Sequence, residues 1–98
     1  DDVSIMSTLQ VNYSGQLALA SAVAEETIDI REGDTVLGLV SRVAKRHGEA
    51  FQKLVFQDDG CIECTLFMAL DGEQVTDLNQ PILVHHRELM LMPPIAGG

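Results

Sequence analysis

One amphipathic helical segment, placed among short alternating segments, constrains the fold most. From about Thr35 to His47 apolar residues recur with helical spacing, Asp34 can cap the start, and Gly48 supplies a C-terminal stop. The segments on either side are too short for long helices and have the period of two that strands show. At 98 residues the chain has room for one modest core. We therefore expect one α+β domain in which about five strands pack on one main helix.

Two strands are expected before the helix, over 9–13 and 27–30, where apolar and polar residues alternate. They pair most simply as a hairpin, and the alanine-rich stretch 17–24 between them favours a short helical turn.

Three more strands are expected after the helix, over 65–70, 73–75 and 88–92, with Asp71-Gly72 as a hairpin turn. The stretch 49–56 lacks a clear period, so we expect irregular structure there. It would supply core side chains, namely Phe51, Leu54 and Phe56.

The charge of the chain limits the classes of partner. Fifteen acidic residues against six basic ones give a formal charge of −9, which repels phosphate backbones and anionic lipids and favours a basic protein surface. No apolar run is long enough to span a bilayer, and no leader is evident. We expect a cytoplasmic protein that binds neither nucleic acid nor membrane.

Three parts are expected along the chain. Residues 1–5 are expected to be disordered or vector-derived, because the first residue is Asp1, and residues 6–92 to form the domain. Residues 93–98 are expected to be a flexible diglycine tail.

The tail is the segment where chemistry is expected. Pro93 and Pro94 cannot continue a sheet ladder and favour an extended chain. Gly97 and Gly98 have no Cβ and can lie in a channel too narrow for other residues. The carboxylate of Gly98 is ionised at neutral pH and can attack a phosphorus of ATP. The alternative is that the diglycine is only a frayed end.

The order of elements, with this tail after the last strand, resembles the ubiquitin-like β-grasp fold of the MoaD/ThiS sulfur carriers, most of all the small subunit of molybdopterin synthase. The resemblance extends from Leu9 to the end of the chain. The segments that carry it are Leu9-Gln10-Val11-Asn12-Tyr13, Gly33-Asp34-Thr35-Val36, Asp71-Gly72-Glu73 and Met92-Pro93-Pro94-Ile95-Ala96-Gly97-Gly98. It implies a mixed sheet.

The resemblance also implies a mechanism. An E1-like adenylyltransferase of the MoeB/ThiF type, using ATP and magnesium, would adenylate Gly98, and sulfur would then replace AMP to give a thiocarboxylate. The tail, Pro93 to Gly97, would thread the partner's active site. The domain would bind no cofactor and provide no catalytic residue and no metal ligand. Further partners would be the large subunit of molybdopterin synthase or an E2-like enzyme.

Two departures from the family's pattern leave the pathway open. Relatives carry an acidic turn before the last strand where this chain has His85-His86-Arg87, and a basic residue after the first strand where it has Ala18. Bacterial ubiquitin-like modifiers, which are conjugated to target proteins by E1- and E2-like enzymes, also end in diglycine. A third alternative is an interaction module with an inert tail.

A partner-binding patch is expected beside the tail. If Leu89 and Leu91 point into the core, then Met90 and Met92 point outward, where flexible thioethers suit an interface. Phe67, on a strand that is apolar on both faces, can join them. The alternative is that these side chains close the edge of the core.

The cysteine pair Cys61 and Cys64 does not predict a metal or redox site. A structural zinc needs four ligands, and the histidines that remain lack the usual spacing. We expect the pair to enter a strand, where its side chains diverge, and to consist of reduced thiols. The adjacent His85 and His86 are expected to form a solvated turn.

Overall fold

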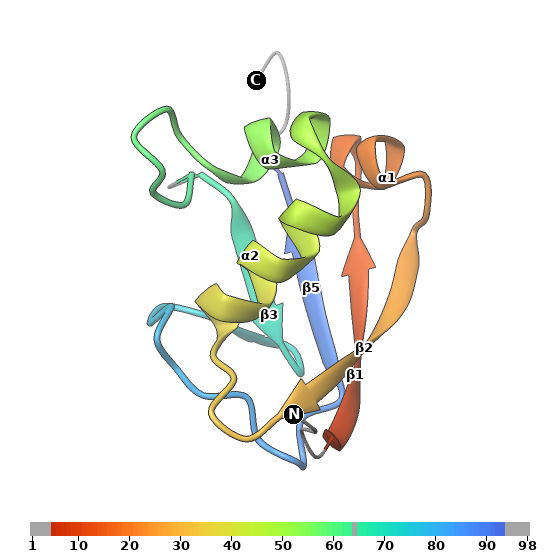
Figure 1. Cartoon of the computed structure of the whole chain (residues 1–98), viewed down its shortest axis with the longest axis vertical. Helices are drawn as coiled ribbons and strands as arrows, with labels where there is room; N and C mark the ends of the chain where they lie inside the picture. The colour runs from red at the N-terminus through yellow and green to blue at the C-terminus, as the bar shows by residue number, and fades with distance from the viewer. Residues whose placement is uncertain (1–4, 64, 94–98) are drawn as a thin grey trace.

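Five strands form one mixed sheet, and the helices lie on one of its faces (Figure 1). The computed structural model describes residues 5–63 and 65–93. The strands are β1 (Ile5–Tyr13), β2 (Glu25–Arg31), β3 (Phe67–Leu70), β4 (Glu73–Gln74) and β5 (Glu88–Met92). The helices are α1 (Gln16–Ser21), α2 (Val36–His47) and α3 (Glu49–Val55). The predicted α+β β-grasp architecture is confirmed.

The last strand lies in the middle of the sheet, whose order is β2-β1-β5-β3-β4. β5 pairs in parallel with β1 on one side and antiparallel with β3 on the other. The predicted hairpin of β1 and β2 is confirmed by their antiparallel register. β1 begins at Ile5, inside the segment that sequence analysis assigned to the N-terminal extension.

The main helix α2 packs on the sheet through Val36, Leu39, Val40, Val43 and Ala44, all buried. Its basic last turn, over 45–47, complements the helix dipole.

The prediction that Asp34 caps α2 is wrong by one residue. Thr35 Oγ1 accepts a hydrogen bond from the Gly38 backbone nitrogen at 3.1 Å. The Asp34 carboxylate instead accepts from the Arg31 backbone nitrogen at 2.8 Å and so closes the β2–α2 turn.

The expectation of an irregular stretch at 49–56 is also wrong, because Glu49–Val55 is helix α3. Phe51 and Val55, one helical turn apart, are fully buried in the core, and Leu54 and Phe56 pack at its edge. β3 is shorter than predicted and begins at Phe67, while the Asp71-Gly72 turn is where it was expected. None of the described helices is long and apolar enough to cross a membrane.

Candidate partner-binding face and tail base

The side chains of β5 alternate between the buried face of the sheet and its open face. Leu89 and Leu91 are completely buried, whereas Met90 is half-buried and Met92 is 37% exposed. The predicted orientation of these four side chains is therefore confirmed. Their role in partner binding stays a prediction.

Phe67 lies beside the two methionines on the open face. It is the register partner of Met92, and Ala69 is the partner of Met90, so these side chains leave the sheet on the same side. Phe67 is 38% exposed. We call Phe67, Met90 and Met92 the apolar patch. Pliable thioethers beside an aromatic ring suit a surface that adapts to another protein.

The other half of the open face, over β1 and β2, is polar. The side-chain amide of Gln10 donates to Asn12 Oδ1 and to Glu25 Oε1, each at 3.0 Å, and Asn12 Nδ2 donates to the Glu88 carboxylate. This polar half was not predicted from the sequence, although the alternation of Gln10 and Asn12 in β1 is a signal for it. The open face thus joins an apolar patch to carboxylates that favour a basic partner surface.

The tail base is held at the end of the sheet where β1 and β5 finish. The Ser14 backbone nitrogen donates to the Leu91 carbonyl at 3.2 Å, just before the chain leaves β5. Pro93, half-buried, is the first residue of the predicted tail. The predicted tail residues Pro94, Ile95, Ala96, Gly97 and Gly98 lie outside the described residues.

The other end of β5 is fixed by the carboxylate of Asp71. Its Oδ1 accepts from the backbone nitrogens of Arg87 at 3.0 Å and Glu88 at 2.9 Å. These bonds lower the pKa of Asp71 below its ordinary value, and the bond from Arg87 contributes most. His86 Nδ1 accepts from the Leu83 backbone nitrogen at 2.8 Å, which confirms a turn here. The His85–Arg87 segment therefore lies at the end of β5 opposite the tail base.

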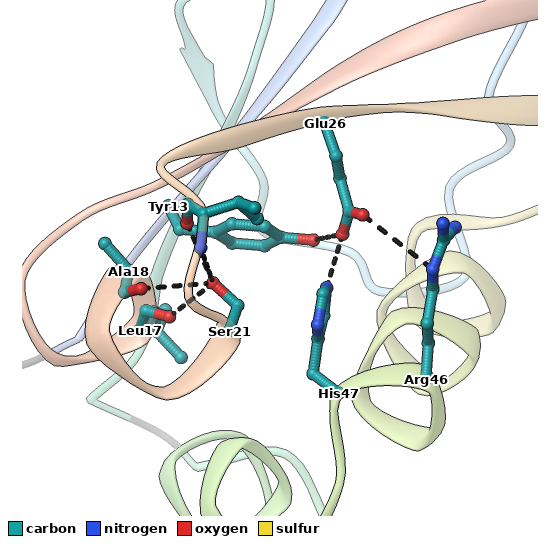
Figure 2. Close-up of polar contacts among 8 residues, drawn as sticks. Tyr13, Leu17, Ala18, Ser21, Glu26, Arg46 and His47 are labelled. Atoms are coloured by element: carbon teal, nitrogen blue, oxygen red, sulfur yellow. Dashed lines mark hydrogen bonds and ion pairs between the residues drawn. The ribbon is translucent and has the colours of Figure 1, made fainter.

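A carboxylate network ties helix α2 to the β1–β2 hairpin (Figure 2). Glu26 accepts a hydrogen bond from the Tyr13 hydroxyl and lies 2.6 Å from His47 Nε2, while Arg46 Nε is 3.9 Å from its other oxygen. Burial raises the pKa of Glu26, but the bonds to Tyr13 and His47 outweigh it and leave the pKa lowered. Burial and the same carboxylate raise the pKa of Tyr13.

This network was not predicted from the sequence. Its members are far apart in the chain and meet only through the β1–β2 register and the end of α2. It stabilises the end of the domain where the tail base lies.

Among the described residues no group of three or more His, Cys, Asp or Glu side chains is placed to hold a metal ion. Cys61 is exposed and lies in a bend, so the expectation that the pair enters a strand is wrong for this residue; Cys64 lies outside the described residues. A hollow of about 550 Å³ between α2 and α3 has charges of both signs in its lining, from Lys45, Lys53, Glu49 and Asp58.

No protein-family model matches the sequence, and no curated protein matches it. Solved structures do. SAMP1 from Haloferax volcanii matches with a TM-score of 0.83 over 94% of this chain and 100% of its own, at 24% sequence identity. This chain has the MoaD/ThiS-like ubiquitin fold.

Two further structures extend this β-grasp likeness. A protein described as subunit 1 of a molybdopterin converting factor from Pyrococcus furiosus matches with a TM-score of 0.71 and 25% identity, over 91% of this chain and 99% of its own. A complex of subunits 1 and 2 of the molybdopterin converting factor from Helicobacter pylori matches with a TM-score of 0.54 and 19% identity, over 93% of this chain and 99% of that one.

Proposed function

We propose that this chain is a ubiquitin-like carrier whose Gly98 carboxylate is activated by an E1-like enzyme. The observation that supports it most is the continuity of tail and patch. The strand that carries Met90 and Met92 continues directly into Pro93, so an enzyme docked on the apolar patch has the start of the tail beside it. The β-grasp likeness to small modifier and converting-factor proteins adds to this support.

The chemistry follows from the poor reactivity of a carboxylate, whose leaving group would be oxide. A Gly98 oxygen attacks the α-phosphorus of ATP, pyrophosphate leaves, and the magnesium held by the activating enzyme neutralises the phosphate charge. Hydrosulfide then attacks the carbonyl carbon, AMP leaves, and loss of the sulfur-bound proton gives a thiocarboxylate. In this scheme the domain is substrate, and the acids, bases and metal belong to the partner.

Two fates of the activated carbonyl have support. The converting-factor relatives favour sulfur transfer in molybdopterin synthesis, and the Helicobacter pylori complex, which joins subunits 1 and 2, favours a large-subunit partner. The SAMP1 relative, named as an archaeal modifier protein, favours the alternative, in which Gly98 is joined to target proteins with the help of an E2-like enzyme.

Intact mass spectrometry separates these fates. The protein is incubated with an E1-like enzyme, ATP, magnesium and sulfide. We expect the mass of an adenylate without sulfide and that of an oxygen-to-sulfur exchange with it. A variant that lacks Gly98 should give neither product. Covalent adducts to other proteins would favour the modifier, and an unchanged mass for the full chain would refute both fates.

The patch is tested with Met90→Asp and a matched control. Met90→Asp places a charge in the apolar patch and should raise KM for activation at least about tenfold, since a buried charge without a partner costs several kcal/mol. Thr27→Asp places the same charge on the polar half of the same face and should leave KM near the wild-type value. Equal KM values for the two variants would remove the patch from the proposal.

A further inference from the structure

Gly15 has a backbone conformation that only glycine adopts readily. It follows β1 and precedes α1, with φ 59° and ψ −128°. Positive φ at this ψ is sterically forbidden for L-residues because the Cβ collides with the neighbouring peptide. The Gly15 carbonyl accepts from the Ala18 backbone nitrogen at 3.1 Å, so this conformation also starts α1. The backbone conformation of Gly15 is therefore fixed by the turn between β1 and α1.

The ring of Pro93 faces the side of Gly15 on which an L-side chain would stand. A Cβ built on Gly15 would be 3.5 Å from Pro93 Cγ and 3.9 Å from Cδ, which is ordinary van der Waals contact. Beside the ring, the backbone nitrogen of Ser14, one residue before Gly15, donates to the carbonyl of Leu91, two residues before Pro93, so a hydrogen bond joins the two segments. Since proline fixes its own φ, a ring held in place sets the direction in which the chain continues.

We infer that Gly15 is a positioning residue for activation of the tail. The turn at Gly15, which the Pro93 ring faces, is here called the seat, and it sets the direction in which the tail leaves the domain. The inference rests on the proposed function, which it deepens. In this proposal the apolar patch binds the activating enzyme, whereas the seat sets the direction in which the tail leaves the domain toward the active site of that enzyme. A misplacement of about 1 Å can cost a hundredfold in rate. Loss of the seat should therefore lower kcat and leave KM alone.

The test compares the two mirror forms of alanine at one position. At φ 59° and ψ −128° a D-residue is in its favoured extended region, the mirror image of the first central position of a type II turn. Gly15→D-Ala keeps the seat, while Gly15→Ala with the L-residue forces the turn to rearrange. Both chains can be made by ligation of the fragments 1–60 and 61–98 at Cys61.

Gly33→Ala is the matched control for strain. Gly33 has φ 90°, and a Cβ there meets nothing within 4 Å. It follows β2, whose last residue pairs with Ile5 at the start of β1, so it lies at the end of the sheet opposite the tail base (Figure 1). Both L-alanine variants should lower the urea midpoint of unfolding, but only the one at Gly15 should affect activation.

The readout is ATP-dependent pyrophosphate release by an E1-like enzyme. Gly15→Ala should lower kcat about tenfold to a hundredfold with little change in KM, and Gly15→D-Ala and Gly33→Ala should keep the wild-type kcat. Pro93→Ala removes the ring from the other side, outside any strand, and should also lower kcat, which keeps the inference testable if Gly15→Ala does not fold. A wild-type kcat for Gly15→Ala or for Pro93→Ala would overturn the inference while leaving the proposed function intact.

A measurement without enzyme distinguishes failure of the inference about Gly15 from failure of the proposed function. Protons of Gly15 and of the Pro93 ring should show a nuclear Overhauser effect in the wild type and in Gly33→Ala, because two ring carbons lie within 4 Å of the position that a Gly15 Cβ would take. If the wild type shows this contact but no pyrophosphate release, the proposed function fails and the seat stands only as a structural contact. If the contact is absent, the seat is refuted whatever the kinetics show.

Discussion

Removal of the Tyr13 hydroxyl is expected to destabilise the fold only while Glu26 is ionised. Tyr13 is 5% exposed, and its hydroxyl donates to the Glu26 carboxylate, which also has His47 as a partner (Figure 2). Tyr13→Phe keeps the ring and its edge-to-face contact with Phe51, whose centroid is 5.2 Å away. The change therefore deletes one hydrogen bond to a charged group and little packing.

The expected cost is about 1 to 2 kcal/mol. A hydrogen bond to a charged group contributes about 1.5 to 3 kcal/mol. We expect a cost around the lower end of that range because the Glu26 side chain keeps 14% of its exposure and water replaces part of the lost bond. For a domain of this size the cost corresponds to a decrease in Tm of about 4 to 16 °C.

The direction of the pKa shift of Glu26 determines how the penalty of Tyr13→Phe depends on pH. The folded-state pKa of Glu26 lies below its ordinary value of 4.5, so its network stabilises the fold above that pH and loses this contribution as the pH falls through the lowered pKa. The penalty of Tyr13→Phe should thus be full at about pH 6.5 and shrink at about pH 3. In the variant the pKa of Glu26, measured by NMR titration, should rise.

Urea unfolding at the two pH values tests this, with Thr27→Val as the control that deletes an exposed hydroxyl from β2. An equal penalty for Tyr13→Phe at both pH values, or an unchanged pKa of Glu26, would refute the reasoning.

Three further predictions concern the helices and the start of β5. Thr35→Ala removes the α2 cap and should lower the free energy of unfolding by about 1 kcal/mol, measured with urea; no loss would mean that the cap bond is absent in solution. Phe51→Ala empties a fully buried site and should cost about 3 to 5 kcal/mol by the same assay, and a cost below 1 kcal/mol would contradict its place in the core. Asp71→Ala removes the acceptor of two backbone bonds and should speed amide hydrogen exchange at Arg87 and Glu88; unchanged protection would contradict the turn described for this carboxylate.

The elements predicted from sequence were those with a strong period and clear punctuation. The β1–β2 hairpin, α2 and β5 follow from alternation, helical spacing and the proline after Met92. Helix α3 was missed because seven residues after Gly48 make about two turns, which is too short a stretch on which to judge a period. Phe51 and Val55, four residues apart, were the available signal.

The N-cap of α2 and the tail base show why local sequence patterns do not predict every contact. Asp34 and Thr35 are both good caps, and only the backbone path decides between them: Thr35 bridges to Pro81 and its side chain is left to face the helix. The outward methionines were predictable from alternation within β5. Gly15 could be identified only as a break in a strand, because the Pro93 ring that faces it is brought there by the parallel pairing of β1 and β5.

The central place of β5 also has a mechanical consequence. A force applied to the chain beyond Pro93 acts along β5 and is resisted at the same time by the parallel ladder to β1 and the antiparallel ladder to β3. Hydrogen bonds loaded in shear share the force, whereas an edge strand can be peeled away one bond at a time. A machine that unfolds proteins by pulling on the tail would meet the strongest part of this domain first.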